Sequence, residues 1–359
     1  MAFHTWDLGQ FHGNGRVVTT EFHRKAEEAD FRRYICLTMA NQNPETPPKK
    51  YDIASLEGEE IIERKTPSGY TTKYVKLHGH WRTFDHVVSG FIPDPRSHVP
   101  EVRQMEVFDD DVFIYAYPKC GTHWVWEMIF MLQRGKAEYD KRPKEVAMLE
   151  FHSLDKLCEE ERPRVFNTHL YPNEVPTSSL EGKGKALILL RNPKDIAVSF
   201  FNHIEDLKFK TSKMTWEDWV YFFNKYGGII DWFEYTKEWE NESKKKKRTY
   251  LCLHYEQMKK NPLATVKSIA DYLGIPCTDA LAEEIVHKCK IENLRVANRE
   301  KFDHRNQSGP NPEMNDPDKM YRKGEVGDWK NWFTVAQSEE FDRVFKTRMA
   351  DSKFKFTYE

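Results

Sequence analysis

The chain has 359 residues, which is enough for one large α/β domain or two smaller domains. Hydrophobic residues make up 39% of the sequence, a globular composition, and the net charge of −2 gives no reason to expect nucleic acid or a membrane as a partner. No apolar run approaches the roughly 18 residues of a membrane-spanning helix, and residues 1–14 lack the apolar stretch of a signal peptide.

The six cysteines are scattered along the sequence, at positions 36, 120, 158, 252, 277 and 289. They form neither a C-x-x-C pair nor a cluster with histidines at zinc-binding spacing. We therefore expect free thiols in a reducing compartment, which predicts a cytoplasmic protein without a metal site.

Residues 1–50 are predicted to be an N-terminal extension. They are polar and end in a proline-containing run typical of a linker, and their pattern predicts one amphipathic helix over residues 22–39. The domain that follows comprises residues 51–359. Its first part, residues 51–110, is predicted to be irregular because Pro93, Pro95 and Pro100 interrupt any long helix.

From residue 111 onward, short apolar runs alternate with helical patterns. The predicted strands are 112–117, 164–167, 186–190 and 250–254. The predicted helices are 122–133, 193–208, 215–225, 229–246, 262–273, 280–288 and 338–349. This alternation predicts an α/β fold with a central parallel sheet that carries helices on both faces.

The most informative segment is Y-P-K-C-G-T-H-W, residues 117–124. It lies between a predicted strand and a predicted helix, so its backbone N–H groups and the helix N-terminus can bind an anion, as in a P-loop. Lys119 adds a charge, and Trp124 adds a flat apolar face that suits a base. The order differs from a Walker A motif, which places a hydroxyl residue beside the lysine for Mg²⁺, and this disfavours a nucleotide kinase.

Two further segments carry basic residues at places suited to a phosphate. Arg191 follows a predicted buried strand, at the sheet edge where open α/β sheets bind ligands, and Ser199 lies two turns along the next helix. Arg322 and Lys323 are followed by Gly324 and Gly327, which predicts a flexible basic loop.

The three segments together resemble the cytosolic sulfotransferases. Y-P-K-x-G-T-x-W, R-N-P-K-D-x-A-V-S and R-K-G-x-x-G-D-W-K occur in that family's order and approximate spacing, and residues 254–262 are similar to its Y-E-x-M-K-x-x-P segment. The resemblance covers about residues 105–350, is weak over 51–104 and is absent from 1–50. It implies a sulfotransferase that uses 3′-phosphoadenosine 5′-phosphosulfate (PAPS), releases 3′,5′-adenosine bisphosphate (PAP) and needs no metal.

The resemblance also implies roles for matching residues in nucleotide binding. The 5′-phosphosulfate would be held by the loop residues Lys119, Cys120, Gly121, Thr122 and His123. The adenine would stack on Trp124, with Tyr255 in contact with the nucleotide and Cys289 where the family usually has a threonine near adenine. The 3′-phosphate would be held by Arg191, Ser199, Arg322, Lys323 and Gly324.

His169 is the implied catalytic base, with Lys119 as the second catalytic residue. The segment R-V-F-N-T-H-L, residues 164–170, is similar to the family's K-T-H-L, and a histidine can take the proton that an attacking hydroxyl must lose. Three positions depart from the family: Cys120 replaces a serine, His123 a threonine and Asn167 a lysine. Asn167 could still donate through its amide, and a protonated His123 could partly replace the missing charge.

The acceptor is expected to be a small hydroxyl compound, aromatic or steroid-like. Candidate lining residues are Phe91, Phe151, Phe201 and His203, and the pocket is expected in residues 70–100, 150–160, 171–178 and the loop 298–316. Two alternatives stay open: a non-catalytic nucleotide-binding relative, and a sulfotransferase-fold enzyme with net dehydration. The segment Lys330–Glu339 fits the family's K-x-x-x-T-V-x-x-x-E dimer segment, so the resemblance implies a homodimer.

Overall fold

The structure is a computed structural model that describes residues 56, 58–83, 94–206, 214–305 and 320–359. The predicted extension 1–50, its helix over 22–39 and Phe91 lie outside the described residues. Within the described part of the chain, no helix combines the length and the apolar character that crossing a bilayer requires.

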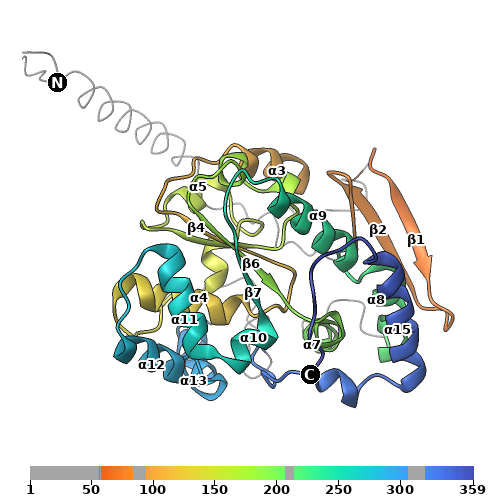
Figure 1. Cartoon of the computed structure of the whole chain (residues 1–359). Helices are drawn as coiled ribbons and strands as arrows, with labels where there is room; N and C mark the ends of the chain where they lie inside the picture. The colour runs from red at the N-terminus through yellow and green to blue at the C-terminus, as the bar shows by residue number, and fades with distance from the viewer. Residues whose placement is uncertain (1–55, 57, 84–93, 207–213, 306–319) are drawn as a thin grey trace, which may run out of the picture. The chain divides into compact units, whose positions relative to one another are not determined.

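The centre of the domain is a parallel sheet of four strands, which confirms the predicted fold class (Figure 1). Its strands are β4 (Val112–Ala116), β5 (Val165–Thr168), β6 (Lys185–Leu190) and β7 (Leu251–His254), in the order β5-β4-β6-β7. Each lies within two residues of its predicted bounds. Every residue of β4 is buried, as expected for a central parallel strand covered on both faces.

The parallel register brings the carboxyl ends of the four strands to one edge of the sheet. His169 directly follows β5, Arg191 directly follows β6, and Tyr255 directly follows β7. Lys119 comes three residues after β4. Because ligands of open α/β sheets bind beyond the carboxyl ends of strands, this register alone gathers the main candidate residues.

Helices cover both faces of this sheet (Figure 1). α4 lies with α11 and α12 on one side, and α7, α8 and α15 lie on the other. The helices are α4 (Thr122–Arg134), α5 (Leu154–Cys158), α6 (Thr177–Leu180), α7 (Pro193–Asp206), α8 (Trp216–Tyr226), α9 (Trp232–Lys244), α10 (Tyr255–Lys260), α11 (Pro262–Leu273), α12 (Asp279–Lys288), α13 (Ile291–Arg305) and α15 (Val335–Arg348). Short 3₁₀ turns are η2 (Lys144–Ala147), η3 (Pro172–Glu174) and η5 (Asp328–Asn331).

The prediction that residues 51–110 are irregular is wrong. β1 (Ile61–Lys65), β2 (Thr71–Leu77) and β3 (His80–Thr83) form an antiparallel sheet. Buried and exposed residues alternate through the first half of β2, which is the pattern of a half-buried strand that the proline-based argument overlooked.

A helix, α3 (Pro95–Arg103), also occupies this region despite Pro100 in its interior. Pro95 sits in its first turn, where a proline needs no N–H, and the Asp94 side chain caps the N-terminus. His98, buried on the inner face, has Nε2 2.7 Å from the Leu149 carbonyl oxygen. Tertiary packing thus offsets the hydrogen bond that Pro100 removes.

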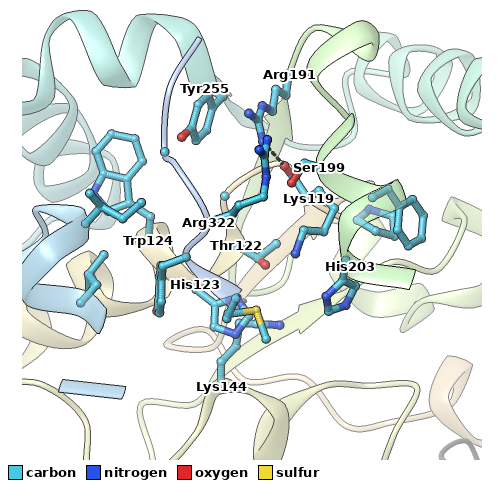
Figure 2. Close-up of a pocket in the computed structure, with 18 of the residues that line it drawn as sticks. Lys119, Thr122, His123, Trp124, Lys144, Arg191, Ser199, His203, Tyr255 and Arg322 are labelled. Carbon is cyan, nitrogen blue, oxygen red and sulfur yellow. Dashed lines mark hydrogen bonds between the residues drawn. The ribbon is translucent and has the colours of Figure 1, made fainter. Parts of the chain in front are cut away.

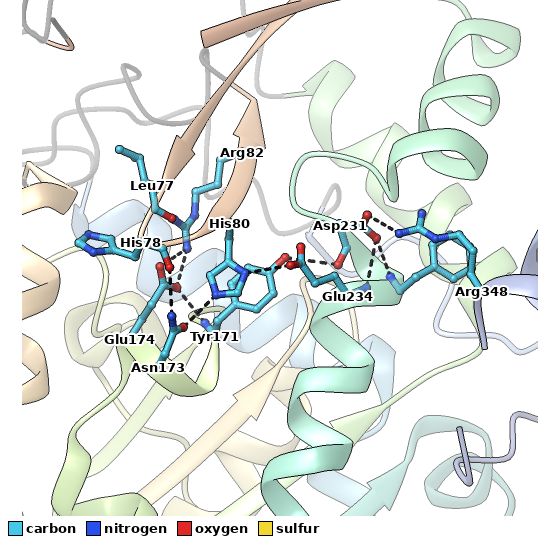
Figure 3. A network of polar contacts seen from close by, with 11 residues as sticks. Leu77, His78, His80, Arg82, Tyr171, Asn173, Glu174, Asp231, Glu234 and Arg348 are labelled. Atoms are coloured by element: carbon cyan, nitrogen blue, oxygen red, sulfur yellow. Dashed lines mark hydrogen bonds and ion pairs between the residues drawn. The ribbon is translucent and has the colours of Figure 1, made fainter. Parts of the chain in front are cut away.

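A polar network attaches the antiparallel sheet to the rest of the domain (Figure 3). Arg82 of β3 pairs with Glu174, and both side chains are almost fully buried. His80 stacks flat on Tyr171 with ring centroids 3.6 Å apart. Its two ring nitrogens lie 3.3 Å from Glu234 Oε1 and 2.9 Å from Asn173 Oδ1.

One further prediction needs correction near the end of the chain. Residues 298–316 were expected to be a loop, but residues 298–305 belong to α13, and the remainder lies outside the described residues. α13 is only weakly amphipathic, so its sequence lacks the apolar stripe from which helices are predicted.

Candidate active site

The loop after β4 has the backbone shape of an anion site. Lys119 and Gly121 both have positive φ angles, of 71° and 95°, which turn the chain sharply before α4 begins at Thr122. A Cβ atom on Gly121 would lie 3.1 Å from Tyr255 Cδ2, so this position also leaves little room for a side chain. The Tyr117 hydroxyl fixes the loop's base by donating to the Gly227 and Ile230 carbonyls.

This loop opens into a main cavity of about 230 Å³ (Figure 2). Most of the residues singled out in the sequence line it: Lys119, Gly121, Thr122, His123, Trp124, Phe151, His169, Arg191, Ser199, His203, Tyr255, Cys289, Arg322, Lys323 and Gly324. The cavity therefore brings together the three sequence segments, although they lie far apart along the chain.

Two predicted site residues do not line this cavity. Cys120 is 1% exposed and belongs to the hydrophobic core, where burial raises the pKa of its thiol. Phe201 is on the side of α7 that packs edge-on against Trp216 and Trp332. A cavity-facing role for the Phe201 ring is therefore excluded by its packing, whereas the backbone of Cys120 remains part of the loop.

Arg191 links the loop after β4 to the basic loop near the C-terminus. Its guanidinium donates to the Lys119 carbonyl at 2.9 Å and to the Glu325 carbonyl at 3.3 Å, and it lies 4.1 Å from the centroid of the Tyr255 ring. Its Nε atom is buried and has no hydrogen-bond partner among the residues that the structure describes. A ligand anion at this point would satisfy that donor.

The two cations of the basic loop meet one carboxylate. Arg322 Nη2 and Lys323 Nζ each lie 2.5 Å from an oxygen of Asp328. Burial alone would raise the pKa of Asp328, but the hydrogen bonds from Lys323, Asn331 and Arg322 outweigh it and hold the pKa at about 2. Asp328 thus remains ionised and keeps both cations beside the cavity.

Asp195 fixes the position of this loop on α7. Its carboxylate accepts hydrogen bonds from the backbone N–H groups of Gly327 and Trp329, at 2.8 and 3.0 Å. Gly324 has a φ of 67°, and a Cβ there would lie 2.6 Å from Ile291 Cδ1. The glycines of this segment therefore meet steric demands of the fold.

Aromatic side chains form one wall of the main cavity. Trp124 meets Tyr255 edge to face, with centroids 5.8 Å apart, and the Lys259 ammonium lies 5.6 Å from the Trp124 ring (Figure 2). Cys289 lines the same cavity. This arrangement offers a flat apolar surface of the kind that an adenine ring requires.

His169 is held in one orientation at the end of β5. Its Nδ1 lies 2.6 Å from the Ala116 carbonyl oxygen, and its backbone N–H donates to Glu150 Oε1 at 2.8 Å. Because a carbonyl can only accept, Nδ1 carries the proton and Nε2 is the basic nitrogen of the neutral ring. The geometry suits a group that accepts a proton through Nε2.

Two other histidines of the cavity are poor bases. His123 Nε2 lies 2.9 Å from Glu145 Oε1, yet burial lowers the pKa of His123 to about 4, with help from the nearby Lys144 charge. Burial also lowers the pKa of His203 well below the ordinary value. Both rings are therefore neutral near pH 7.

A smaller side chamber, of about 70 Å³, adjoins the main cavity. The two share Pro118, Met148, Phe151, His169, Phe200 and Ile229. The chamber's remaining lining comes from Arg82, Pro95, His98, Val99, Glu150, Leu170 and Ile230. His169 therefore lies where the two spaces meet.

Sequence reasoning missed several lining residues, above all Lys144 and Glu145 of η2. No motif marks them, because they reach the cavity through contacts with β5. The segment 171–178, which was expected to build the pocket, supplies none of the residues that line the main cavity or the side chamber in the described part of the chain. Among the described residues, no group of three or more His, Cys, Asp or Glu side chains is placed to hold a metal ion.

Comparison with known proteins agrees with this geometry. The family model of the sulfotransferase domain matches residues 109–353. Sulfotransferase 1B1 of Canis lupus familiaris is 33% identical over 272 residues, which cover 72% of this chain and 90% of the relative. Sulfotransferase 1A1 of Mus musculus is 33% identical over 281 residues, covering 71% and 90%.

Solved structures extend the comparison. Mouse sulfotransferase SULT7A1 complexed with PAP is 26% identical, with a TM-score of 0.60, and the match covers 78% of this chain and 96% of that one. Retinol dehydratase in a complex with retinol and PAP shares the fold, with 19% identity, a TM-score of 0.64 and coverage of 84% and 99%. The chain therefore belongs to the sulfotransferase family and is a PAPS-dependent sulfotransferase.

Proposed function

We propose that this enzyme transfers the sulfuryl group of PAPS to a hydroxyl of a small, aromatic or steroid-like acceptor, with His169 as the general base. The observation that carries the proposal is the position of His169. Its Nδ1 is fixed on the Ala116 carbonyl oxygen, and its ring lines both the main cavity and the side chamber. A nucleotide in the first space and an acceptor in the second would meet at this ring.

The residues of the main cavity fit PAPS. Among the described residues, the Nε atoms of Arg191 and Arg322 and the indole Nε1 of Trp124 are buried donors without a hydrogen-bond partner. Gly121 has no side chain, so the loop stays unobstructed where it passes closest to Tyr255. We assign the 3′-phosphate to Arg191, Ser199, Arg322, Lys323 and Gly324, and the 5′-phosphosulfate to Lys119, Thr122 and the amides of the loop 119–123.

When bound, PAPS supplies the sulfuryl group and a phosphate leaving group. His169 Nε2 takes the proton of the acceptor hydroxyl as the acceptor oxygen forms its bond to sulfur, and the bond from sulfur to the phosphate oxygen breaks with its electrons left on that oxygen. Lys119, placed by the strained loop, stabilises the charge that builds on the phosphate. Positioning and charge stabilisation carry most of such a reaction.

The acceptor is assigned to the side chamber. Its walls are mainly apolar, with Val99, Phe151 and Ile230 among them, and this suits an apolar part of the acceptor. Glu150 also lines it, and within the described part of the chain its buried Oε2 has no hydrogen-bond partner. An acceptor with a second donor group would satisfy that oxygen.

Two alternatives are separated from the proposal by product analysis. Retinol dehydratase shares this fold, so a sulfate ester that eliminates to an alkene is a distinct outcome. A non-catalytic relative would bind nucleotide without turnover. Incubation with PAPS and a panel of phenols, sterols and allylic alcohols, followed by mass spectrometry, distinguishes ester, alkene and no product.

Nucleotide binding is tested separately from turnover. PAP should stabilise the protein against heat much more than 5′-AMP does, because each charged phosphate contact is worth about 1.5–3 kcal/mol. Equal thermal shifts with the two nucleotides would refute the 3′-phosphate assignment. Adding EDTA to the assay tests the proposal that no metal is needed, since activity should persist.

We also propose a homodimer through the segment Lys330–Glu339. Val335 at the start of α15 is 76% exposed, which is unusual for a large apolar side chain and suits a small self-complementary contact. We expect a dimer at micromolar concentration by light scattering and a monomer for Val335→Glu. A wild-type monomer across that range would contradict this proposal alone.

The proposed location is the cytoplasm. The five cysteines in the described part of the chain, at positions 120, 158, 252, 277 and 289, are all free thiols. Free thiols suit a reducing compartment. Fractionation of cells that express the tagged protein tests this location.

A further inference from the structure

The sequence leaves one charge of the reaction centre unaccounted for. At position 167, where the family resemblance implies a lysine near the transferred group, this chain has Asn167. Asn167 lies in β5 and is fully buried, and it does not line the main cavity. Its amide donates to the carbonyl oxygens of Lys144 and Ala147, at 3.1 and 3.4 Å, so both donor hydrogens are engaged.

The expectation that Asn167 or His123 replaces this charge does not agree with the geometry. The Asn167 amide has no hydrogen left for a ligand oxygen, and His123 is neutral near pH 7 with its Nε2 against Glu145. The cation must therefore come from another side chain of the cavity.

Lys144 is placed to provide it. It comes from η2 and lines the main cavity on the side of His123 (Figure 2). Its Nζ donates to Asn167 Oδ1 at 2.8 Å and lies 3.9 Å from Glu145 Oε1. Its third contact is Met148 Sδ, 4.0 Å away. A thioether is a weak acceptor, so the ammonium hydrogen on that side can be donated to a ligand oxygen instead.

The side chain of Lys144 is only 4% exposed, which is rare for a lysine. Burial lowers the pKa of this ammonium, and the carboxylates of Glu145 and Glu150 oppose that decrease. A lysine with only a structural role would place its ammonium group in solvent, which costs less free energy than burying it. A buried ammonium that lines the same cavity as Lys119 and His169 indicates a function toward an anion.

We propose that Lys144 is a catalytic residue that supplies the second cation of the reaction centre, and that Asn167 is its positioning residue. This inference rests on the function proposed above. Lys144 stabilises the negative charge on the sulfuryl oxygens and on the phosphate oxygen that keeps the electrons of the broken bond. In this chain the charge is thus carried by η2 and its neutral partner by β5.

The main variant is Lys144→Met, with Lys141→Met as the matched control, because Lys141 is an exposed lysine three residues away. With the best acceptor of the phenol and sterol panel, we expect Lys144→Met to lower kcat by about 10²–10³-fold, the loss typical of one preorganised donor. The control should keep wild-type turnover. The thermal shift caused by PAP should stay close to wild type in both.

A second readout does not depend on turnover. Orthovanadate added to the PAP complex with acceptor mimics the five-coordinate centre of an in-line transfer. We expect Lys144→Met to weaken vanadate binding by about tenfold or more while leaving PAP affinity unchanged. The exchange variant, Lys144→Asn with Asn167→Lys, should recover at least about tenfold in kcat over Lys144→Asn alone.

The results that would contradict the Lys144 proposal can be told apart from those that would contradict the proposed function. Turnover of Lys144→Met within about threefold of wild type overturns the proposal, and so does loss of the PAP thermal shift, which would make Lys144 a nucleotide-binding or structural residue. An exchange variant no more active than Lys144→Asn overturns the pairing with Asn167. A wild-type protein without turnover, or with equal shifts from PAP and 5′-AMP, instead refutes the proposed function itself.

Discussion

The nucleotide side of the main cavity and the side chamber are built in different ways. The nucleotide side consists of residues that directly follow strands or glycines, such as Arg191 after β6 and Tyr255 after β7. The side chamber combines residues far apart in the chain, such as Arg82, Glu150 and Ile230. The nucleotide side is formed by short continuous segments of the sequence. The side chamber is formed only when distant segments come together on folding.

This difference shows how specificity can change while the reaction is kept. In the proposed function, backbone amides and residues at strand ends hold the nucleotide, so we expect that side to tolerate little variation in shape. The side chamber depends on single side chains from several elements, each of which can be replaced separately. If this view is right, substitutions on the two sides should affect different kinetic constants.

The largest effect is expected at His169, where the two spaces meet. His169→Ala should lower kcat by about 10²–10⁴-fold because it removes the proposed general base. PAP binding should stay nearly intact, since the base acts on the acceptor. The control is His287→Ala, an exposed histidine on α12. An active His169→Ala enzyme would require a different base.

Arg191 tests the nucleotide side. Arg191→Met should weaken PAP binding by about 10–150-fold, the equivalent of one or two charged hydrogen bonds, while 5′-AMP binding changes much less. Arg343→Met is the control, because Arg343 is exposed and pairs with Glu340 of its own helix. Equal losses for PAP and 5′-AMP would mean that Arg191 acts by holding the Lys119 carbonyl rather than by binding the 3′-phosphate.

The sequence predicted the nucleotide side far better than the side chamber. The strands β4 to β7 were predicted within two residues, and Lys119, His169, Arg191 and Arg322 do meet in one cavity. Their positions depend on the local chain geometry at strand ends, and short sequence motifs reflect that geometry.

The incorrect and missing predictions have a common physical cause. β1 to β3 and α3 were overlooked because prolines were weighed above the alternation in β2, although packing offset Pro100. Phe201 was misplaced because the direction of a ring on α7 depends on its partners Trp216 and Trp332. Lys144 carries no motif at all, and its role follows from a hydrogen bond to Asn167 that only the folded chain contains.

Phe151 tests the side chamber. Phe151→Leu removes a flat ring shared by both spaces, so KM for an aromatic acceptor should rise by about 2–12-fold, the range expected for one aromatic contact. PAP affinity should not change. Phe201→Leu is the matched control: it should lower the melting temperature by disturbing the core without a change in KM. An altered PAP affinity in Phe151→Leu would contradict the separation of the two sides.

The smallest effect is expected at His80, which supports the side chamber through the network around Arg82 and Glu174 (Figure 3). Burial alone would lower the pKa of His80, but the hydrogen bond to Glu234 and the nearby Glu174 charge raise it above the ordinary value. Both ring nitrogens face acceptor oxygens, those of Glu234 and Asn173, as a doubly protonated ring requires.

Because the pKa of His80 is higher in the folded than in the unfolded state, its stabilisation is complete below about pH 6.5 and is lost as pH rises through the folded-state pKa. The loss should be at most about 1.5–3 kcal/mol in the free energy of unfolding, the size of one charged hydrogen bond. Urea unfolding of wild type and His80→Gln from pH 5.5 to 8.5 measures it as the difference between the two curves. That difference should shrink with rising pH, while exposed His287→Gln should follow wild type. A difference that grows with pH would mean that His80 is neutral in the folded protein, and that the small sheet is held by Arg82 and Glu174 without a charge on its neighbour.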